Sequence, residues 1–205
     1  MAATAQGHAS GDAMPSDCAV IEVRVGELKQ IFNSMDPAPF WERDLDPDAV
    51  EYIVESAQEV RAGRPLGLIV HLDREPVTPE ATAMLREAVH EDFKHRAVAS
   101  RRQLRQLLRV GRISLLIGLL FLAAAIIVGD VIVGLVSRER SGTFVQESLI
   151  IGGWVALWRP LEIFLYEWWP IRAEARLYDR LSVMPVHLVD AGTAVEAREN
   201  ANKSE

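Results

Sequence analysis

The chain has 205 residues, a formal net charge of −7 and a hydrophobic content of 49%, values that suit a globular protein. The average hides a strong partition, because Ile113–Val136 is almost wholly apolar and Ser148–Trp158 forms a second apolar run. Cys18 is the only cysteine, which excludes an intramolecular disulfide and a cysteine-based metal cage.

The N-terminal part has the composition of a leader followed by a small soluble domain. Residues 1–19 are rich in Ala, Ser and Gly without periodicity, which predicts a disordered leader. Val20–Val25 alternates apolar and polar residues, and Leu66–Leu72 is nearly continuously apolar, so each predicts a strand. Between them, Asp46 followed by proline predicts the start of a helix that ends near Gly63. We therefore predict a small two-stranded α+β domain over residues 20–77.

A loop rich in Asp-Pro pairs and aromatic residues precedes that helix. Asp-Pro pairs favour turns, so the segment is predicted to be a structured loop. Its exposed-looking aromatic pair makes it a possible docking surface for another protein. The residues proposed for that docking loop are Asp36, Phe40, Trp41 and Asp44.

A long helix is predicted after Thr78-Pro79, because no Pro or Gly interrupts the chain from Glu80 to Val110. Residues 78–112 would form a basic connecting helix that continues into the membrane. From Phe93 to Arg112 there is no acidic residue. This basic cluster directly precedes an apolar segment, so it is predicted to contact lipid head groups rather than nucleic acid. The predicted head-group contacts are Arg101, Arg102, Arg105, Arg109 and Arg112.

Two transmembrane helices are predicted, joined by a short loop at residues 137–147. The first, residues 113–136, would extend about 36 Å, which exceeds the ~30 Å hydrocarbon core. The second, residues 148–169, would extend about 33 Å and end in an interfacial belt of Trp168 and Trp169, with Pro170 as a helix stop. A re-entrant or interfacial helix is the alternative for the second segment.

The basic residues predict the orientation of this hairpin. They flank the start of the first span and follow the end of the second, whereas the loop between the spans contains only Arg138 and Arg140. Cytoplasmic segments carry an excess of Lys and Arg. Both termini, including a tail at residues 170–205, are therefore predicted to be cytoplasmic, with the loop in the periplasm.

Arg159 and Glu162 form a predicted intramembrane polar pair, because residues at i and i+3 are neighbours on a helix. Pro160 cannot donate an amide hydrogen to the Ala156 carbonyl and is expected to kink the helix. If the two tryptophans mark the interface, Arg159 lies roughly 12–15 Å inside it. Charges are rare in the hydrocarbon. The pair is therefore interpreted as an internally neutralised pair near a helix end, a polar lock onto a partner helix, or a proton or ion relay.

The soluble part offers little positive indication of catalysis. No nucleophile elbow, phosphate-binding loop or dinucleotide fingerprint is present in the sequence. Glu87 and His90 match half of a di-iron carboxylate motif without the second half, and the aspartates from Asp44 to Asp48 lack the glycine and distal glutamate of a calcium loop. The expectation is a protein without catalytic residues, metal or cofactor, although a membrane-tethered enzyme with an unrecognised site is a third alternative.

Two stretches, Phe32–Asp46 and Gly153–Pro170, resemble a group of uncharacterised bacterial membrane proteins with two spans. The resemblance covers most of Ile21–Val186 and implies a bacterial inner membrane, but no activity. Together with the residues above, it leads us to expect a non-enzymatic adaptor or accessory subunit. Its expected partners are membrane lipids and either another membrane protein or further copies of the same chain.

Overall fold

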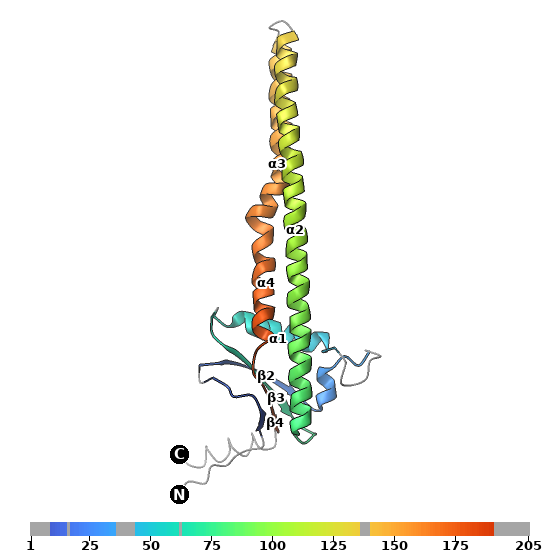
Figure 1. The fold of residues 1–205 in the computed structure, drawn as a ribbon, viewed down its shortest axis with the longest axis vertical. Helices are drawn as coiled ribbons and strands as arrows, with labels where there is room; N and C mark the ends of the chain where they lie inside the picture. The colour runs from blue at the N-terminus through green and yellow to red at the C-terminus, as the bar shows by residue number, and fades with distance from the viewer. Residues whose placement is uncertain (1–8, 16, 36–43, 62, 136–139, 191–205) are drawn as a thin grey trace. The chain divides into compact units, whose positions relative to one another are not determined.

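The computed structural model describes residues 9–15, 17–35, 44–61, 63–135 and 140–190 (Figure 1). The chain divides into two compact units. Unit 1 combines residues 1–97 with residues 176–205, and unit 2 comprises residues 98–175. The predicted α+β domain therefore also contains residues from the C-terminal part of the chain.

Unit 1 contains a four-stranded sheet rather than the predicted two-stranded one. Its strands are β1 (Ala9–Gly11), β2 (Ala19–Val25), β3 (Leu66–Leu72) and β4 (Val186–Asp190). The order is β1-β4-β3-β2, in which β2, β3 and β4 run parallel and β1 runs antiparallel to β4. The two predicted strands are β2 and β3. The predicted leader adds β1, and the predicted tail adds β4.

The register of the parallel strands aligns apolar side chains in rows. Leu68 of β3 pairs with Ile21 of β2 and with Val186 of β4. All three side chains are buried. Successive residues of a strand point to opposite faces of the sheet, so every second residue contributes to this core. The next row, two residues further along each strand, continues it.

Two helical segments lie in the connection between β2 and β3. The 3₁₀ helix η1 (Leu28–Ile31) follows β2, and α1 (Pro47–Glu59) leads to β3. The Asp46 side chain accepts a hydrogen bond of 3.0 Å from the Asp48 amide, which confirms the predicted N-cap. The α1 residues that join the core are Val50, Ile53 and Ala57.

The third parallel strand is reached only after the whole of unit 2. Helix α2 (Pro79–Leu135) begins where Thr78 Oγ1 accepts a hydrogen bond of 3.1 Å from the Ala81 amide. Its first turns bury Leu85, Val89 and Phe93, which are spaced by four residues and so lie on one face. Helix α4 (Trp168–Leu181) then leads to β4. Unit 2 is thus an insertion in the connection between two neighbouring parallel strands.

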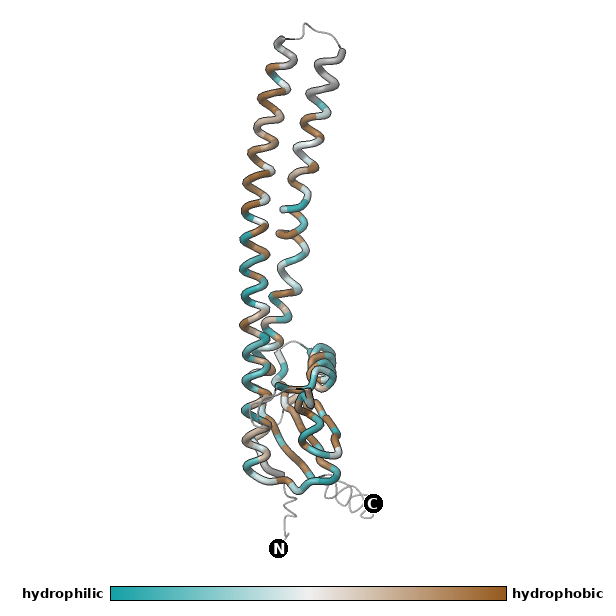
Figure 2. Tube along the Cα trace, turned by 90° about the vertical axis from the view of Figure 1, so that its right-hand side faces the viewer, coloured by the Kyte–Doolittle hydropathy of each residue, from teal (hydrophilic) through white to brown (hydrophobic). Residues whose placement is uncertain are grey.

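Unit 2 is built from the rest of α2, from α3 (Arg140–Glu162), from the π-helical turn η3 (Ile163–Glu167) and from the start of α4. Within the described residues, two helical stretches are long and apolar enough to cross a membrane (Figure 2). Pro170 does not stop the helix as predicted, because α4 continues to Leu181. The π-helical turn runs into α4 without a break, since Trp168 has helical backbone angles, and the chain continues through Pro170 in the helix.

Candidate functional site

Glycine residues allow the two helices of unit 2 to pack closely. A Cβ atom added to Gly118 of α2 would lie 2.8 Å from Leu157 Cδ2 and 3.2 Å from the Ala156 carbonyl oxygen. Pro160 has no amide hydrogen to donate to that carbonyl. A side chain at position 118 would therefore require Leu157 and the Ala156 carbonyl to shift.

Three contacts define the register of this hairpin. Gly111 faces Ile163, Gly118 faces Leu157, and Leu122 faces Gly153. In each pair the two residue numbers add up to 274 or 275. The two helices are therefore antiparallel, and their register stays constant over this length. For any residue on one helix, the residue opposite it on the other helix follows from this register.

This register places Glu162 level with Arg112, the last arginine before the apolar run of α2. Arg159 is level with Leu116, about 6 Å further along at 1.5 Å per residue. Trp168, by contrast, is level with the arginine-rich segment of α2 and not with the edge of the apolar run. Arg159 and Glu162 therefore lie within about one helical turn of the edge of the apolar run.

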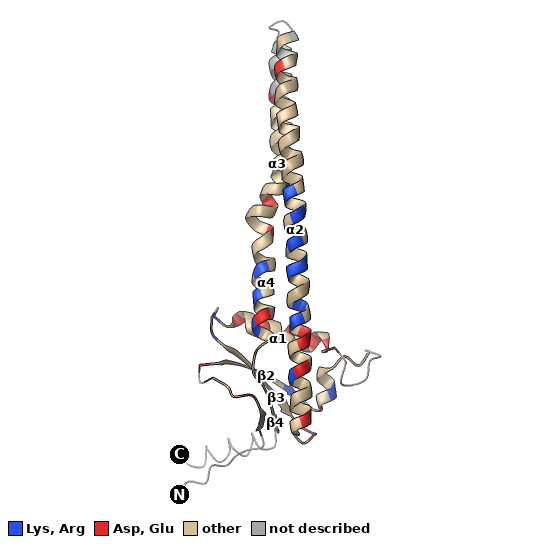
Figure 3. Cartoon of the chain, in the orientation of Figure 1, with Lys and Arg blue, Asp and Glu red and all other residues tan. Residues whose placement is uncertain are grey.

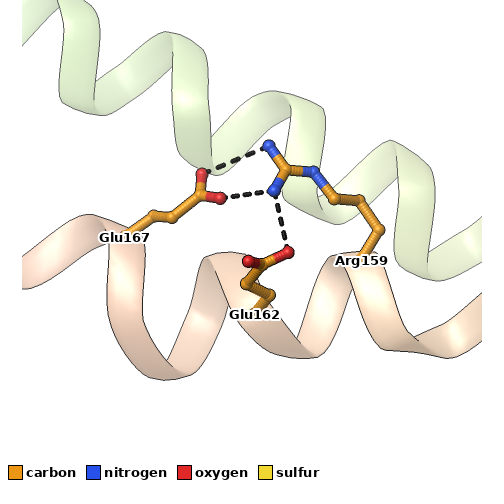
Figure 4. Close-up of polar contacts among 3 residues, drawn as sticks. All are labelled: Arg159, Glu162 and Glu167. Atoms are coloured by element: carbon orange, nitrogen blue, oxygen red, sulfur yellow. Dashed lines mark hydrogen bonds and ion pairs between the residues drawn. The ribbon is translucent and has the colours of Figure 1, made fainter.

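Arg159 binds two carboxylates rather than the one predicted (Figure 4). Its Nη1 donates to Glu162 Oε2 at 2.9 Å and to Glu167 Oε1 at 2.5 Å, and Nη2 lies 3.4 Å from Glu167 Oε2. The three side chains are 60%, 44% and 29% exposed, respectively. We call Arg159, Glu162 and Glu167 the charged cluster. It contains one more carboxylate than guanidinium groups.

The π-helical turn explains why Glu167 belongs to this cluster. In a regular α-helix the residue at i+7 returns to nearly the same face, whereas i+8 is turned away by about 80°. A π-helical turn inserts one extra residue. Glu167, eight residues after Arg159, therefore occupies the place that Tyr166 would otherwise have. Sequence periodicity missed this contact because it assumes a regular helix.

The predicted head-group arginines lie along α2 (Figure 3). Spacings of three, four and three residues align Arg102, Arg105, Arg109 and Arg112 on one face, which we call the arginine stripe. All four side chains are exposed, and none of them makes an ion pair within the part of the chain that the structure describes. Arg101 is exposed too but has a polar interaction of its own.

The two tryptophans of the predicted belt differ in their surroundings. The Trp168 Nε1 donates a hydrogen bond of 2.8 Å to the Phe164 carbonyl in the π-helical turn. The Arg172 guanidinium lies 5.7 Å from the centre of the Trp168 ring, a cation–π distance. Trp169 is 58% exposed. By the register given above, both residues lie level with the arginine stripe rather than with the edge of the apolar run.

Other predicted residues lie elsewhere or outside the described chain. Asp36, Phe40 and Trp41 of the docking loop are outside the described residues, and the Asp44 carbonyl accepts a hydrogen bond of 2.9 Å from the Asn33 amide. His90 Nε2 lies 2.8 Å from the Met184 carbonyl oxygen. Among the residues that the structure describes, no group of three His, Cys, Asp or Glu side chains could hold a metal ion.

Comparisons with protein-family models, curated proteins and solved structures find no match to this chain. The functional argument therefore depends on the apolar helices, the charged cluster and the arginine stripe.

Proposed function

We propose that this chain is an integral membrane protein that crosses a bacterial inner membrane as a helical hairpin and acts as a non-enzymatic adaptor or accessory subunit. The observation that carries the proposal is the exposure of the apolar helices. In each candidate span, only 17% of the most apolar window is buried. A core helix of a soluble protein would bury its apolar side chains. Lipid is the environment that would cover them here.

The register of the hairpin supports a consistent pair of spans. Residues 113–135 of α2 lie level with residues 140–162, which are the bounds of α3. Each stretch of 23 residues would extend about 34 Å, enough for the ~30 Å core. This proposal moves the second span from residues 148–169 to residues 140–162. The π-helical turn and α4 would then lie at the membrane surface, beside the arginine stripe.

The distribution of basic residues supports a cytoplasmic location for unit 1. The arginine stripe and Arg172 flank the same end of both spans. By the excess of basic residues on cytoplasmic sides, this end would face the cytoplasm. Unit 1 follows directly from both helices at this end, so the α/β domain and both termini would be cytoplasmic, as the sequence predicts.

An adaptor role is supported by apolar surface that the hairpin itself leaves uncovered. Trp154 and Trp158 of α3 are 65% and 72% exposed and lie one turn apart on one face. Large aromatic side chains are frequent anchors in protein interfaces. A helix of another membrane protein, or of a second copy, could pack against this face. The cytoplasmic domain would then be held beside that partner.

The charged cluster supports the adaptor better than the relay that we keep as the alternative. A proton or ion relay needs titratable groups along a path through the hydrocarbon. The cluster instead lies about one turn from the edge of the apolar run. Its excess carboxylate is the observation that keeps the relay as a second candidate. We therefore assign the cluster an anchoring role at the interface.

Labelling with a membrane-impermeant maleimide would test the topology. Cys18 is the only cysteine, so a Cys18→Ser variant gives a background for single substitutions such as Ser137→Cys between the spans. In intact spheroplasts, Ser137→Cys should be labelled, whereas native Cys18 should react only after lysis. Labelling of both sites in intact spheroplasts, or of neither, would contradict the hairpin.

A pull-down from native membranes in mild detergent would test the adaptor role. A stoichiometric membrane-protein partner, or a defined homo-oligomer, that is lost on Trp154→Ala and Trp158→Ala would support it. Leu165→Ala, which changes an exposed apolar residue outside the proposed span, serves as the matched control. Recovery of the protein as a monomer without a partner would exclude the adaptor and favour the relay.

A further inference from the structure

The arginine stripe is longer than the layer of lipid head groups. Arg102 and Arg112 are ten residues apart, which corresponds to about 15 Å along the helix axis. The head-group region adds only about 5–8 Å on each side of the hydrocarbon core. With Arg112 at the edge of the core, Arg109 lies within the head-group layer. Arg105 and Arg102 then lie about 10 and 15 Å from that edge, beyond the phosphates of ordinary phospholipids.

The outer part of the stripe has the features of an anion site. An open hollow on α2 is lined by Arg102, Arg105, Gln106 and Arg109. The guanidinium groups have no carboxylate partner within the described residues. Within the hairpin, the Glu162 and Glu167 carboxylates are bound to Arg159. The charged cluster thereby leaves the stripe available for an external anion.

The face of the stripe continues into the apolar part of α2. Leu116 and Leu120 follow Arg112 at four-residue spacing and are 60% and 63% exposed. Acyl chains of a lipid could lie along these leucines while its phosphates contact the arginines. A free anion or a nucleic acid would use the arginines without the leucines. The combination favours a lipid.

On the basis of the proposed hairpin, we infer that the arginine stripe binds an anionic lipid whose head group carries a second, outer phosphate. Arg109 and Arg112 contact the phosphate that is linked to the acyl chains. Arg102 and Arg105 bind the outer phosphate, because a guanidinium matches the geometry of phosphate oxygens. The stripe therefore distinguishes lipids with an outer phosphomonoester from lipids with a single phosphodiester.

The test compares phosphatidylinositol 4-phosphate with phosphatidylinositol, which differ only in the outer phosphate. Full-length protein in detergent micelles is titrated with each lipid, and lipid adducts are measured by native mass spectrometry. Each basic residue near an anionic head group contributes about fivefold in affinity. We expect phosphatidylinositol 4-phosphate to bind at least about fivefold more tightly. Arg102→Gln with Arg105→Gln should abolish this preference and retain the binding of phosphatidylinositol.

Matched controls separate this inference from general charge effects and from the proposed function. Arg24→Gln with Arg61→Gln removes the same charge from exposed positions of unit 1 and should keep the preference. Equal binding of the two lipids, or a preference that survives loss of Arg102 and Arg105, would overturn the inference. Complete displacement by millimolar inorganic phosphate would overturn the assignment to a lipid. If maleimide labelling supports the hairpin but the lipids bind equally, this inference alone fails.

Discussion

Phe93 and Tyr178 stack with their ring centroids 6.2 Å apart and their planes inclined by 26°. Phe93 lies on α2 before the chain enters unit 2, and Tyr178 lies on α4 after the chain has left it. The contact therefore joins the outgoing and returning segments inside unit 1. Because Phe93 is fully buried, the sheet and both helix ends share one core, although 84 residues separate the two rings in sequence.

Unit 1 should fold without the apolar hairpin if its two chain segments are reconnected. We predict that residues 9–97, joined through a short Gly-Ser linker to residues 176–190, form a water-soluble monomer with both helical and sheet structure. Size-exclusion chromatography and circular dichroism would measure this. The same protein ending at residue 97 is the control. It lacks Leu181, Met184 and Leu188, each at most 1% exposed, and should aggregate. Equal solubility and structure of the two proteins would contradict a shared core.

Removing the Phe93 ring, which joins the outgoing and returning segments of the chain, should destabilise unit 1 strongly. Phe93→Ala leaves a cavity in a fully buried position, and such substitutions cost about 3–5 kcal/mol. Chemical denaturation of the shortened domain, followed by circular dichroism, would measure the free energy of unfolding. Met35→Ala at an 88% exposed position should change it by less than about 0.5 kcal/mol. If Phe93→Ala lowers the free energy of unfolding by less than about 1 kcal/mol, the contact of Phe93 with Tyr178 is not part of the core.

Local patterns predicted the elements whose stabilising contacts are close in sequence. The alternation of Val20–Val25 and the cap at Asp46 gave β2 and α1, because both depend on neighbouring residues. Local patterns did not predict β1 or β4, because these two strands pair across about 180 residues of intervening chain, with Ala9 opposite Val189. A strand of three residues has no periodicity to detect. Its existence depends on a partner that only the folded chain brings near.

The charged cluster shows the same limit at a smaller scale. Arg159 and Glu162 were predicted to pair because i and i+3 are neighbours on any helix. Glu167 was missed because its place depends on one extra residue in the π-helical turn. The level of the cluster relative to the arginines of α2 could not be predicted either, since the sequence alone gives no register between helices. Contacts such as Gly118 with Leu157 supply that register.

Close packing at Gly118 predicts a clear contrast between two glycines of the hairpin. Gly118→Val would force side-chain atoms against Leu157 and the Ala156 carbonyl, where space is already limiting. It should lower the thermal unfolding midpoint of the full-length protein in detergent by several degrees, since overpacking costs about 1–3 kcal/mol. Gly152→Val is the matched control, because no atom lies within 4 Å of its added Cβ. Equal shifts for the two variants would refute the proposed register.

Burial raises the pKa of the Cys18 thiol, and nearby Arg64 only partly offsets this effect. Because the thiolate is the reactive form, alkylation of folded protein should reach half-maximal rate at a higher pH than in unfolded protein. The neutral thiol is favoured in the folded state, so its contribution to stability is present below the unfolded pKa. That contribution is lost as the pH rises through the folded pKa. Arg64→Gln should move the alkylation midpoint further up, whereas a midpoint equal to that of the unfolded chain would contradict burial.

The two carboxylates of the charged cluster should differ in their contribution to the hairpin. Glu167 contacts both Nη1 and Nη2 of Arg159, whereas Glu162 contacts Nη1 alone. Glu167→Gln should therefore lower the thermal midpoint of the full-length protein in detergent more than Glu162→Gln does. The reverse charge arrangement, Arg159→Glu with Glu167→Arg, should recover part of the loss. A larger effect of Glu162→Gln would contradict the bidentate contact.

Deleting Leu165 should preserve the coupling of Arg159 with Glu167, because it removes the extra residue of the π-helical turn. The turn would become α-helical, and the glutamate, now seven residues after Arg159, would stay on nearly the same face. A double-mutant cycle of Arg159→Gln and Glu167→Gln measures their coupling through thermal midpoints. We expect coupling in the native chain and in Leu165→Ala, which shortens an exposed side chain but keeps the residue count. The deletion should keep it, and a loss of coupling there would show that the π-helical turn is not what brings Glu167 to this face.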